Sequence, residues 1–187
     1  MRPTTDTYIA LHSGIKFNFR DPKPDHILIE DIAHSLSMQC RYNGHSGKFY
    51  SVAEHCVHIA MWMYDRKAPG NKNMALEALM HDASEAYVCD IPRPIKPFLD
   101  PLYQDLETTV ERAIARKYNL ALPWNDFIKE ADARICLDEY AALFEPRLGP
   151  CDWTLPYDEP LGITIGAWQP SEAKRAFLNI FNYLTGA

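Results

Sequence analysis

The sequence predicts an all-α fold in a single domain, and three observations lead to this expectation. Residues 51–54 form a capping box, in which Ser51 is the N-cap and Glu54 is the third helical residue. Residues 102–118 and 126–144 repeat apolar side chains at helical spacing. The 187 residues contain no internal repeat, low-complexity tract or polar linker that would divide them.

The first half of the chain is expected to begin with a short β-hairpin and to continue with three helices. Residues 8–19 alternate polar and apolar groups around Ser13-Gly14, as the strands of a hairpin do. Pro22 and Pro24 then break the chain before the first helix. The three helices are expected at about residues 29–40, 51–64 and 73–88.

The second half is expected to contain three more helices. The prolines of residues 90–97 cannot continue a helix and stiffen that connection. Residues 145–170 are rich in Pro, Gly and aromatic side chains, which indicates a structured loop with a minor strand at 162–166. Ser171 is expected to cap the last helix. The helices are expected at 102–118, 126–144 and 171–184. Residues 1–187 then form one domain, with a helical core at about 29–144 and a C-terminal loop and helix at 145–187.

Composition narrows the class of protein. The formal net charge of −6 argues against a broad surface for a nucleic-acid polymer, although it leaves room for a small phosphate pocket. The five cysteines are odd in number and form no C-x-x-C pair, which favours reduced thiols and a cytoplasmic location. The richest apolar run, residues 56–64, is too short to span a bilayer, so no membrane partner is expected.

The dipeptide His81-Asp82 is the most informative feature for function. At helical spacing, His81, Asp82 and Glu85 continue a face that begins with Met74 and Ala78 and that has apolar neighbours. A buried carboxylate costs several kcal/mol unless it is paired or binds a cation. This face therefore predicts a metal site.

Two further candidate ligands lie on other expected helices. His55 follows the capping box directly, and Asp132 shares a helix face with Glu139. Two His and two Asp suit zinc, cobalt, manganese or iron, and magnesium is also compatible. Taken singly, Asp132 would pass for a surface acid and His55 for a core histidine, while His58 is a rival ligand.

The order His, His-Asp, Asp on successive helices resembles the HD-domain metal-dependent phosphohydrolases. The local sequences are similar to the compact 5′-deoxynucleotidases and to the phage deoxynucleoside triphosphohydrolases. The resemblance implies an HD-domain helical bundle in which His55, His81, Asp82 and Asp132 bind a divalent metal. It selects His55 over His34, because the first metal histidine of the family follows a Ser/Ala-Glu pair. The segments that carry the resemblance are residues 40–44, 52–56, 81–86, 90–96 and 129–132.

The same resemblance suggests roles around the metal. Glu85, one turn from His81, is assigned general acid/base duty with Asp82 as its partner. An Asp-x-Pro-x turn contacts deoxyribose in the family, and Arg93 in this turn departs from the small polar residue of the monophosphatases. The expected phosphate contacts are Arg41, Lys96 and Lys129; the expected sugar contacts are Tyr42 (where the family often has Trp), Asp90, Ile91, Pro92 and Arg93.

The function expected from these residues is hydrolysis of the 5′ phosphate ester of 2′-deoxynucleotides by a homo-oligomer. Two versions stay open: release of phosphate from a monophosphate, or release of triphosphate from a triphosphate such as dATP. The alternative is a non-catalytic HD domain that binds nucleotide as a sensor, which Glu85 beside the metal argues against. Hydrolysis of alarmones or cyclic nucleotides is disfavoured, because the sequence lacks the extra motifs of those relatives.

Overall fold

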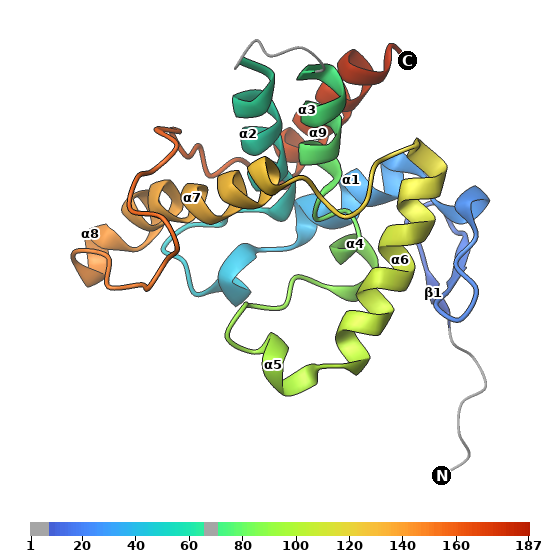
Figure 1. Cartoon of the computed structure of the whole chain (residues 1–187), viewed down its shortest axis with the longest axis horizontal. Coiled ribbons are helices and arrows are strands. Elements are labelled where there is room, and N and C mark those ends of the chain that lie inside the picture. Colours follow the sequence, from blue (N-terminus) through green and yellow to red (C-terminus); the bar gives the residue numbers. More distant parts are fainter. Residues whose placement is uncertain (1–7, 66–70) are drawn as a thin grey trace.

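A computed structural model describes residues 8–65 and 71–187, and this part of the chain is mostly helical, as predicted (Figure 1). The N-terminal hairpin is also confirmed: β1 (Tyr8–Ala10) pairs antiparallel with β2 (Lys16–Asn18). Gly14 adopts a φ of +88° in the connecting turn, which a residue with a side chain would resist. The turn is fixed to the helical body because Ser13 donates hydrogen bonds of 2.7 Å from its amide and hydroxyl to the buried Asp31 carboxylate.

Four helices surround the main core. They are α1 (Ile29–Met38), α2 (Val52–Asp65), α3 (Asn71–Met80) and α9 (Pro170–Thr185). The last helix packs against the other three, and Figure 1 shows it beside α2 and α3 although it lies far from them in sequence. Ser51 caps α2 as expected, because its hydroxyl accepts the amide of Glu54 at 3.1 Å. The cap expected at Ser171 is wrong, because α9 begins at Pro170 and its N-cap is Gln169. The fully buried apolar side chains of this core include Ile32, Leu36, Ile59, Leu79 and Phe177.

Two long helices flank this core and reach the region of the predicted site. They are α6 (Leu102–Tyr118) and α7 (Asp126–Leu143), close to the predicted bounds. The side chain of Asn125 caps α7 by accepting the amide of Phe127. A second apolar cluster lies at the C-terminal end of α7. It consists of Tyr50, Tyr140, Leu143 and Phe144. The shorter helical segments are η1 (Pro24–His26), η2 (Arg41–Gly44), α5 (Lys96–Leu99) and α8 (Glu145–Leu148), the last within the segment predicted as a loop.

The helix predicted at residues 73–88 is not continuous. It ends at Met80 as α3, and α4 (Glu85–Val88) begins after a turn that contains His81 and Asp82. In this turn the amides of Ala83 and Glu85 bond to the carbonyls three residues before them. The carbonyl of Ala78 receives the His81 side chain at 2.8 Å. An uninterrupted helix would use that carbonyl for the amide of Asp82, so the His81 side chain competes with the helical bond.

The minor strand predicted at residues 162–166 is also wrong, because this segment has no strand partner among the described residues. Two carboxylates bind its backbone amides instead. Asp138 accepts the amides of residues 161, 162 and 163 at 2.8 to 3.0 Å. The fully buried Glu54 accepts those of residues 166, 167 and 168 at 2.7 to 2.9 Å. Side chains therefore satisfy the amides that a sheet would otherwise pair.

No helix within residues 8–65 and 71–187 combines the length and the apolar character needed to cross a membrane.

Candidate metal centre and adjoining pocket

His55 projects from the first turn of α2 into the interior and is fully buried. Its Nδ1 lies 2.7 Å from Oε1 of Glu139, and a carboxylate can only accept, so Nδ1 carries the proton. The other ring nitrogen, Nε2, is therefore unprotonated in the neutral ring. It lies 3.2 Å from Oδ1 of Asp132 and 3.5 Å from Oδ2 of Asp82.

The ring of His81 is also oriented through its Nδ1, but by a backbone carbonyl. Its Nδ1 donates to the carbonyl of Ala78, which leaves Nε2 as the free nitrogen of the neutral ring. That atom lies 3.3 Å from Oδ1 of Asp82 and 3.9 Å from Oδ1 of Asp132. Both Nε2 atoms are buried, and neither has a hydrogen-bond partner within the described residues.

These side chains form a group that could hold a metal ion. The ligand atoms of His55, His81 and Asp132 all lie within 4.8 Å of one another. Each imidazole offers its free nitrogen inward and is held from behind by a hydrogen bond, the usual arrangement of a metal-binding histidine. Asp82 meets His81 in a second, overlapping group with Cys56, a candidate ligand that the sequence reasoning missed.

The electrostatics of the group reflect the crowding of acids and imidazoles. Burial and Arg41 oppose protonation of His55, but Glu139 and Asp132 outweigh them and raise its pKa. Burial likewise lowers the pKa of His81, yet Asp82 and Asp132 raise it well above the ordinary value. Burial alone would raise the pKa of Asp132, but the two imidazoles hold it well below its usual range. Such a site favours positive charge between its carboxylates.

Glu139 is a site residue that the sequence reasoning noted only as a neighbour on the Asp132 face. It is fully buried and accepts hydrogen bonds from His55 and from the hydroxyl of Tyr42. The guanidinium of Arg41 lies 3.5 Å away. Burial opposes its charge, but Arg41 and His55 lower its pKa to about 2. Its position seven residues after Asp132, two helical turns along the same face, was the signal that could have identified it.

Glu85 begins α4 and is buried near the same group. Its Oε2 has no hydrogen-bond partner among the described residues. Burial, then Asp82 and Asp90, raise its pKa well above the usual value against the opposing effect of Arg41. Gln39, which the sequence reasoning missed, holds this region by donating to the Glu85 carbonyl and accepting the Asp90 amide, each at 3.0 Å. Glu85 is therefore a carboxyl group suited to carrying a proton.

A pocket of about 740 Å³ adjoins the group. Two of its arginines contact the candidate ligands: Arg41 lies 3.6 Å from Asp82, and Arg93 lies 3.4 Å from Asp132. Of the predicted substrate residues, Arg41, Tyr42, Asp90, Pro92 and Arg93 line the pocket, together with Asn43, His45, Pro94, Ile95, Cys136, Phe144, Trp153, Thr154 and Leu155.

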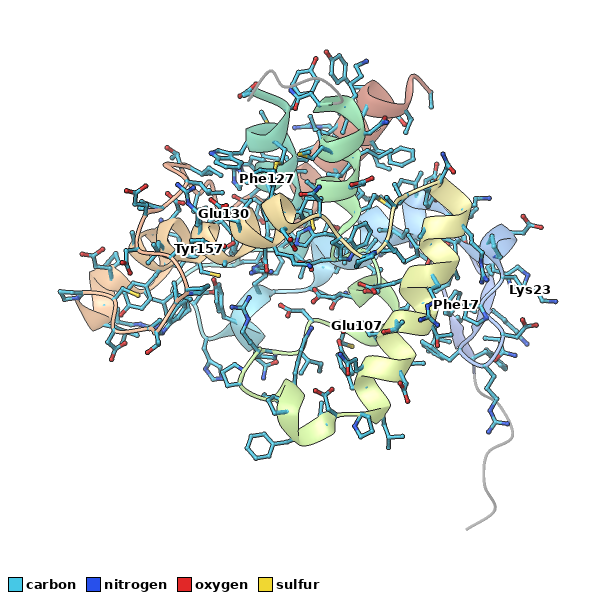
Figure 2. The ribbon with its side chains drawn as sticks, in the orientation of Figure 1. Phe17, Lys23, Glu107, Phe127, Glu130 and Tyr157 are labelled. Carbon is cyan, nitrogen blue, oxygen red and sulfur yellow. The ribbon has the colours of Figure 1, made fainter. Side chains whose placement is uncertain are left out.

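The other predicted substrate residues do not line this pocket. Ile91 is half-buried and does not line the pocket. Lys96 pairs at 3.1 Å with Glu107, which Figure 2 shows projecting from α6 toward the middle of the molecule. Lys129 is 57% exposed and pairs with Asp126 at 2.9 Å, so the structure does not bring it to this pocket. It lines a separate hollow with Phe127, Glu130 and Tyr157, whose side chains are labelled in Figure 2.

The remaining histidines considered as ligands also have other neighbours. His58 lies 3.3 Å from the Glu54 carboxylate, and its ring is 5.0 Å from that of Trp168. His34 stacks on His12 with ring centroids 3.7 Å apart. Neither belongs to the groups that could hold a metal within the described part of the chain.

Comparison with known proteins found no matching family model. The chain is 41% identical over 126 residues to the uncharacterized protein YfdR of Escherichia coli K12, an alignment that covers 67% of this chain and 66% of that protein. It is 32% identical over 178 residues to the uncharacterized protein RCAP_rcc00048 of Rhodobacter capsulatus, with coverage of 88% and 89% respectively.

Proposed function

This chain belongs to the same protein family as the Rhodobacter capsulatus protein, and we propose that it is an HD-domain phosphohydrolase that cleaves the 5′ phosphate ester of 2′-deoxynucleotides. One observation carries the proposal. Two buried imidazole Nε2 atoms, which have no hydrogen-bond partner in the part of the chain that the structure describes, face two carboxylates, and the arginines that contact those carboxylates also line a pocket.

In this proposal, a divalent cation is held by His55, His81 and Asp132, with Asp82 beside them. The donor set of imidazole and carboxylate suits zinc, cobalt or manganese better than a purely hard cation. When bound, such a cation supplies Lewis acidity, which polarises a phosphoryl oxygen and acidifies water.

The protein supplies the remaining groups. Arg41 and Arg93 would bind the anionic phosphoryl oxygens that the cation does not neutralise. Glu85 would hold its proton because it is buried beside Asp82 and Asp90. Water forms a new bond to phosphorus while the bond from phosphorus to the 5′ oxygen breaks, and Glu85 gives its proton to that leaving oxygen. The attacking water would give up one proton, and its transfer to the Glu85 carboxylate would restore the protonated acid for the next turnover.

Sugar and phosphate recognition would come from the turn after α4. Asp90 lines the pocket near Arg41 and could accept a hydrogen bond from a 3′-hydroxyl. Arg93 is 65% exposed at the pocket rim, where it could also contact a second or third phosphate. Both the monophosphate and the triphosphate versions of the reaction therefore stay within this proposal.

A product panel tests the function directly. The metal-loaded protein is incubated with deoxynucleoside mono- and triphosphates and with the matching ribonucleotides, and the products are separated. We expect phosphate or triphosphate release from the deoxy substrates, with slower release from the ribo forms. A protein that binds metal and nucleotide but releases neither product would be a sensor, which contradicts the proposed enzyme.

The variant Glu85→Gln tests the assignment of the proton donor. It should keep its metal content and fold but lose roughly two to four orders of magnitude in kcat, the range for a positioned acid/base group. Glu172→Gln, which changes an exposed acid of α9, is the matched control and should turn over normally. Normal turnover by Glu85→Gln would show that another group protonates the leaving oxygen.

A further inference from the structure

The pocket beside the metal group has two chemically different linings. Arg41, Asp90 and Arg93 contribute charge, whereas Tyr42, Phe144 and Trp153 contribute aromatic rings. Tyr42 contacts both sets: its ring is 5.4 Å from the Arg41 guanidinium and 5.1 and 5.5 Å from the rings of Phe144 and Trp153. A molecule that fills such a pocket needs an anionic group joined to a flat apolar group.

We propose that Trp153, with Tyr42 and Phe144, forms a subsite that stacks the base of the nucleotide. This inference rests on the proposed function and adds to it the part of the pocket that recognises the base. Aromatic side chains bind bases of any sequence because every base has a π-face. The volume of about 740 Å³ is within the usual range for a small-ligand pocket.

The position of Trp153 is set by its own contacts rather than by a ligand. Its ring meets Tyr140 edge-on at 4.8 Å and 81°, and Phe144 at 5.3 Å and 64°. These geometries are favourable for aromatic pairs. Farther along the same segment, Asp138 fixes the backbone of residues 161–163 through three amides. The half-buried Trp153 ring is thus held at the pocket wall before a base arrives, which reduces the entropic cost of binding.

Hydrogen bonds also connect the aromatic side of the pocket to the candidate metal ligands. The hydroxyl of Tyr42 donates to Oε2 of Glu139, whose Oε1 accepts from His55. Tyr42 and the next residue, Asn43, both have a φ of 56°, a conformation uncommon outside glycine. This unusual turn places Tyr42 against Glu139 and beside Trp153 at once. The aromatic side chains proposed to stack the base are therefore held at a fixed position relative to the candidate ligand His55.

Binding to matched ligands tests the subsite separately from turnover. The probes are dAMP and 2-deoxyribose 5-phosphate, which has the same sugar phosphate without a base. Their affinities are measured by calorimetry with metal-loaded Glu85→Gln protein, in which hydrolysis is suppressed. Trp153→Leu in this background should weaken dAMP binding roughly 10-fold to 100-fold, the range for loss of one stacking partner. Binding of 2-deoxyribose 5-phosphate should not change.

Two further variants control for damage to the fold. Trp168→Leu alters a tryptophan of the same C-terminal segment that packs on His58 outside the pocket, and it should bind dAMP normally. Trp153→Phe keeps an aromatic ring and should bind dAMP more tightly than the sugar phosphate. Addition of dAMP should quench tryptophan fluorescence in the parent protein but not in Trp153→Phe.

The outcomes separate the subsite from the proposed function. If the Glu85→Gln protein, the parent of these variants, binds dAMP no better than 2-deoxyribose 5-phosphate, the proposed base subsite is wrong, but the proposed hydrolysis of the ester is not contradicted. If the parent binds neither probe, both proposals fail. Equal weakening of both probes by Trp153→Leu, or full fluorescence quenching in Trp153→Phe, would overturn the role of Trp153.

Discussion

Glu139 orients His55 from the side opposite the other candidate ligands. Its Oε1 accepts from Nδ1 at 2.7 Å, which leaves Nε2 directed at Asp132 and Asp82. His81 obtains the same orientation from a backbone carbonyl, which no side-chain substitution removes. A substitution can therefore remove the hydrogen bond that orients His55 but not the one that orients His81, so Glu139 is the residue to change.

Glu139→Gln should weaken divalent metal binding by roughly 10-fold to 100-fold, as loss of the carboxylate behind a ligating histidine usually does. The amide still accepts a hydrogen bond, but it no longer supplies the charge that favours the orientation of His55. Competition with a chromogenic chelator measures the affinity. Asp126→Asn is the control, since that carboxylate is 96% exposed and pairs only with Lys129 among the described residues. Equal affinities in wild type and Glu139→Gln would remove Glu139 from the site.

At the level of secondary-structure elements, the first turn of α2 carries an acid, Glu54, directly before an imidazole, His55, and the two side chains have different roles. His55 faces the candidate metal group, while Glu54 binds the amides of residues 166–168. In a capping box Glu54 would return to the N-cap amide, so only the half made by the Ser51 hydroxyl is present. The helix that supplies a candidate ligand also fixes the segment leading into α9.

Glu54→Gln should destabilise the protein by roughly 1–3 kcal/mol, the cost of leaving buried donors poorly paired. The amide has one acceptor oxygen, whereas the carboxylate uses both of its oxygens on three backbone amides. Urea unfolding measures the free energy, and hydrogen exchange should show lost protection at residues 166–168. Glu130→Gln, which removes a half-exposed pair with Arg134, should change neither. Unchanged exchange at residues 166–168 would contradict the role of Glu54.

Glu111 of α6 offers a test of pH dependence. Burial raises the pKa of Glu111 above 4.5, although its bond from Trp124 opposes the shift. Because the pKa is higher in the folded chain, Glu111 contributes most below pH 4.5, and that contribution is lost as the pH rises. Glu111→Gln should therefore gain stability relative to wild type as the pH increases from 4.5 upward.

Urea unfolding at several pH values measures this difference, with the exposed Glu172→Gln as the control. A difference between Glu111→Gln and wild type that is constant with pH would show that Glu111 ionises equally in the folded and unfolded chains.

At the scale of the whole molecule, the final helix completes the core that holds the site. In Figure 1, α9 lies against α2 and α3. Phe177 of α9 is fully buried and belongs to the main apolar core. The contacts of α9 with α1, α2 and α3 bring the end of the chain to helices of the first half, of which the last, α3, ends at Met80. Removing the buried side chains of α9 should therefore destabilise the fold as a unit.

Phe177→Ala should lower the free energy of unfolding by roughly 3–5 kcal/mol, the usual cost of truncating a core phenylalanine. The loss combines transfer free energy with the cavity left behind, since a packed core relaxes only in part. Chemical denaturation measures it. Leu148→Ala, at a side chain that is 61% exposed, should change stability little. Similar losses in both variants would mean that α9 contributes no more than the surface does.

Local sequence patterns were sufficient to predict the helical class, the hairpin and most helix bounds. The capping serine at residue 51, the prolines of residues 90–97 and the apolar spacing of 126–144 act on neighbouring backbone, so they can be interpreted locally. The candidate ligands were selected through a resemblance, because the order of His55, His81-Asp82 and Asp132 is similar to that of the HD-domain phosphohydrolases, whereas His55 and Asp132 taken singly would not stand out. Their role as ligands stays a prediction, with the geometry of His55, His81 and Asp132 compatible with it.

The features that depend on distant partners became visible only in the folded chain. Glu139 reaches His55 across 84 residues, and Glu54 reaches the amide of Trp168 across 114. The break of the helix at His81 and the missing strand at 162–166 have the same origin, because side chains take over hydrogen bonds that local patterns assign to the backbone. Trp153 lines the pocket and packs there against Tyr42, Tyr140 and Phe144. Periodicity describes which face of an element is apolar, whereas the identity of the group opposite that face is fixed only when the chain folds.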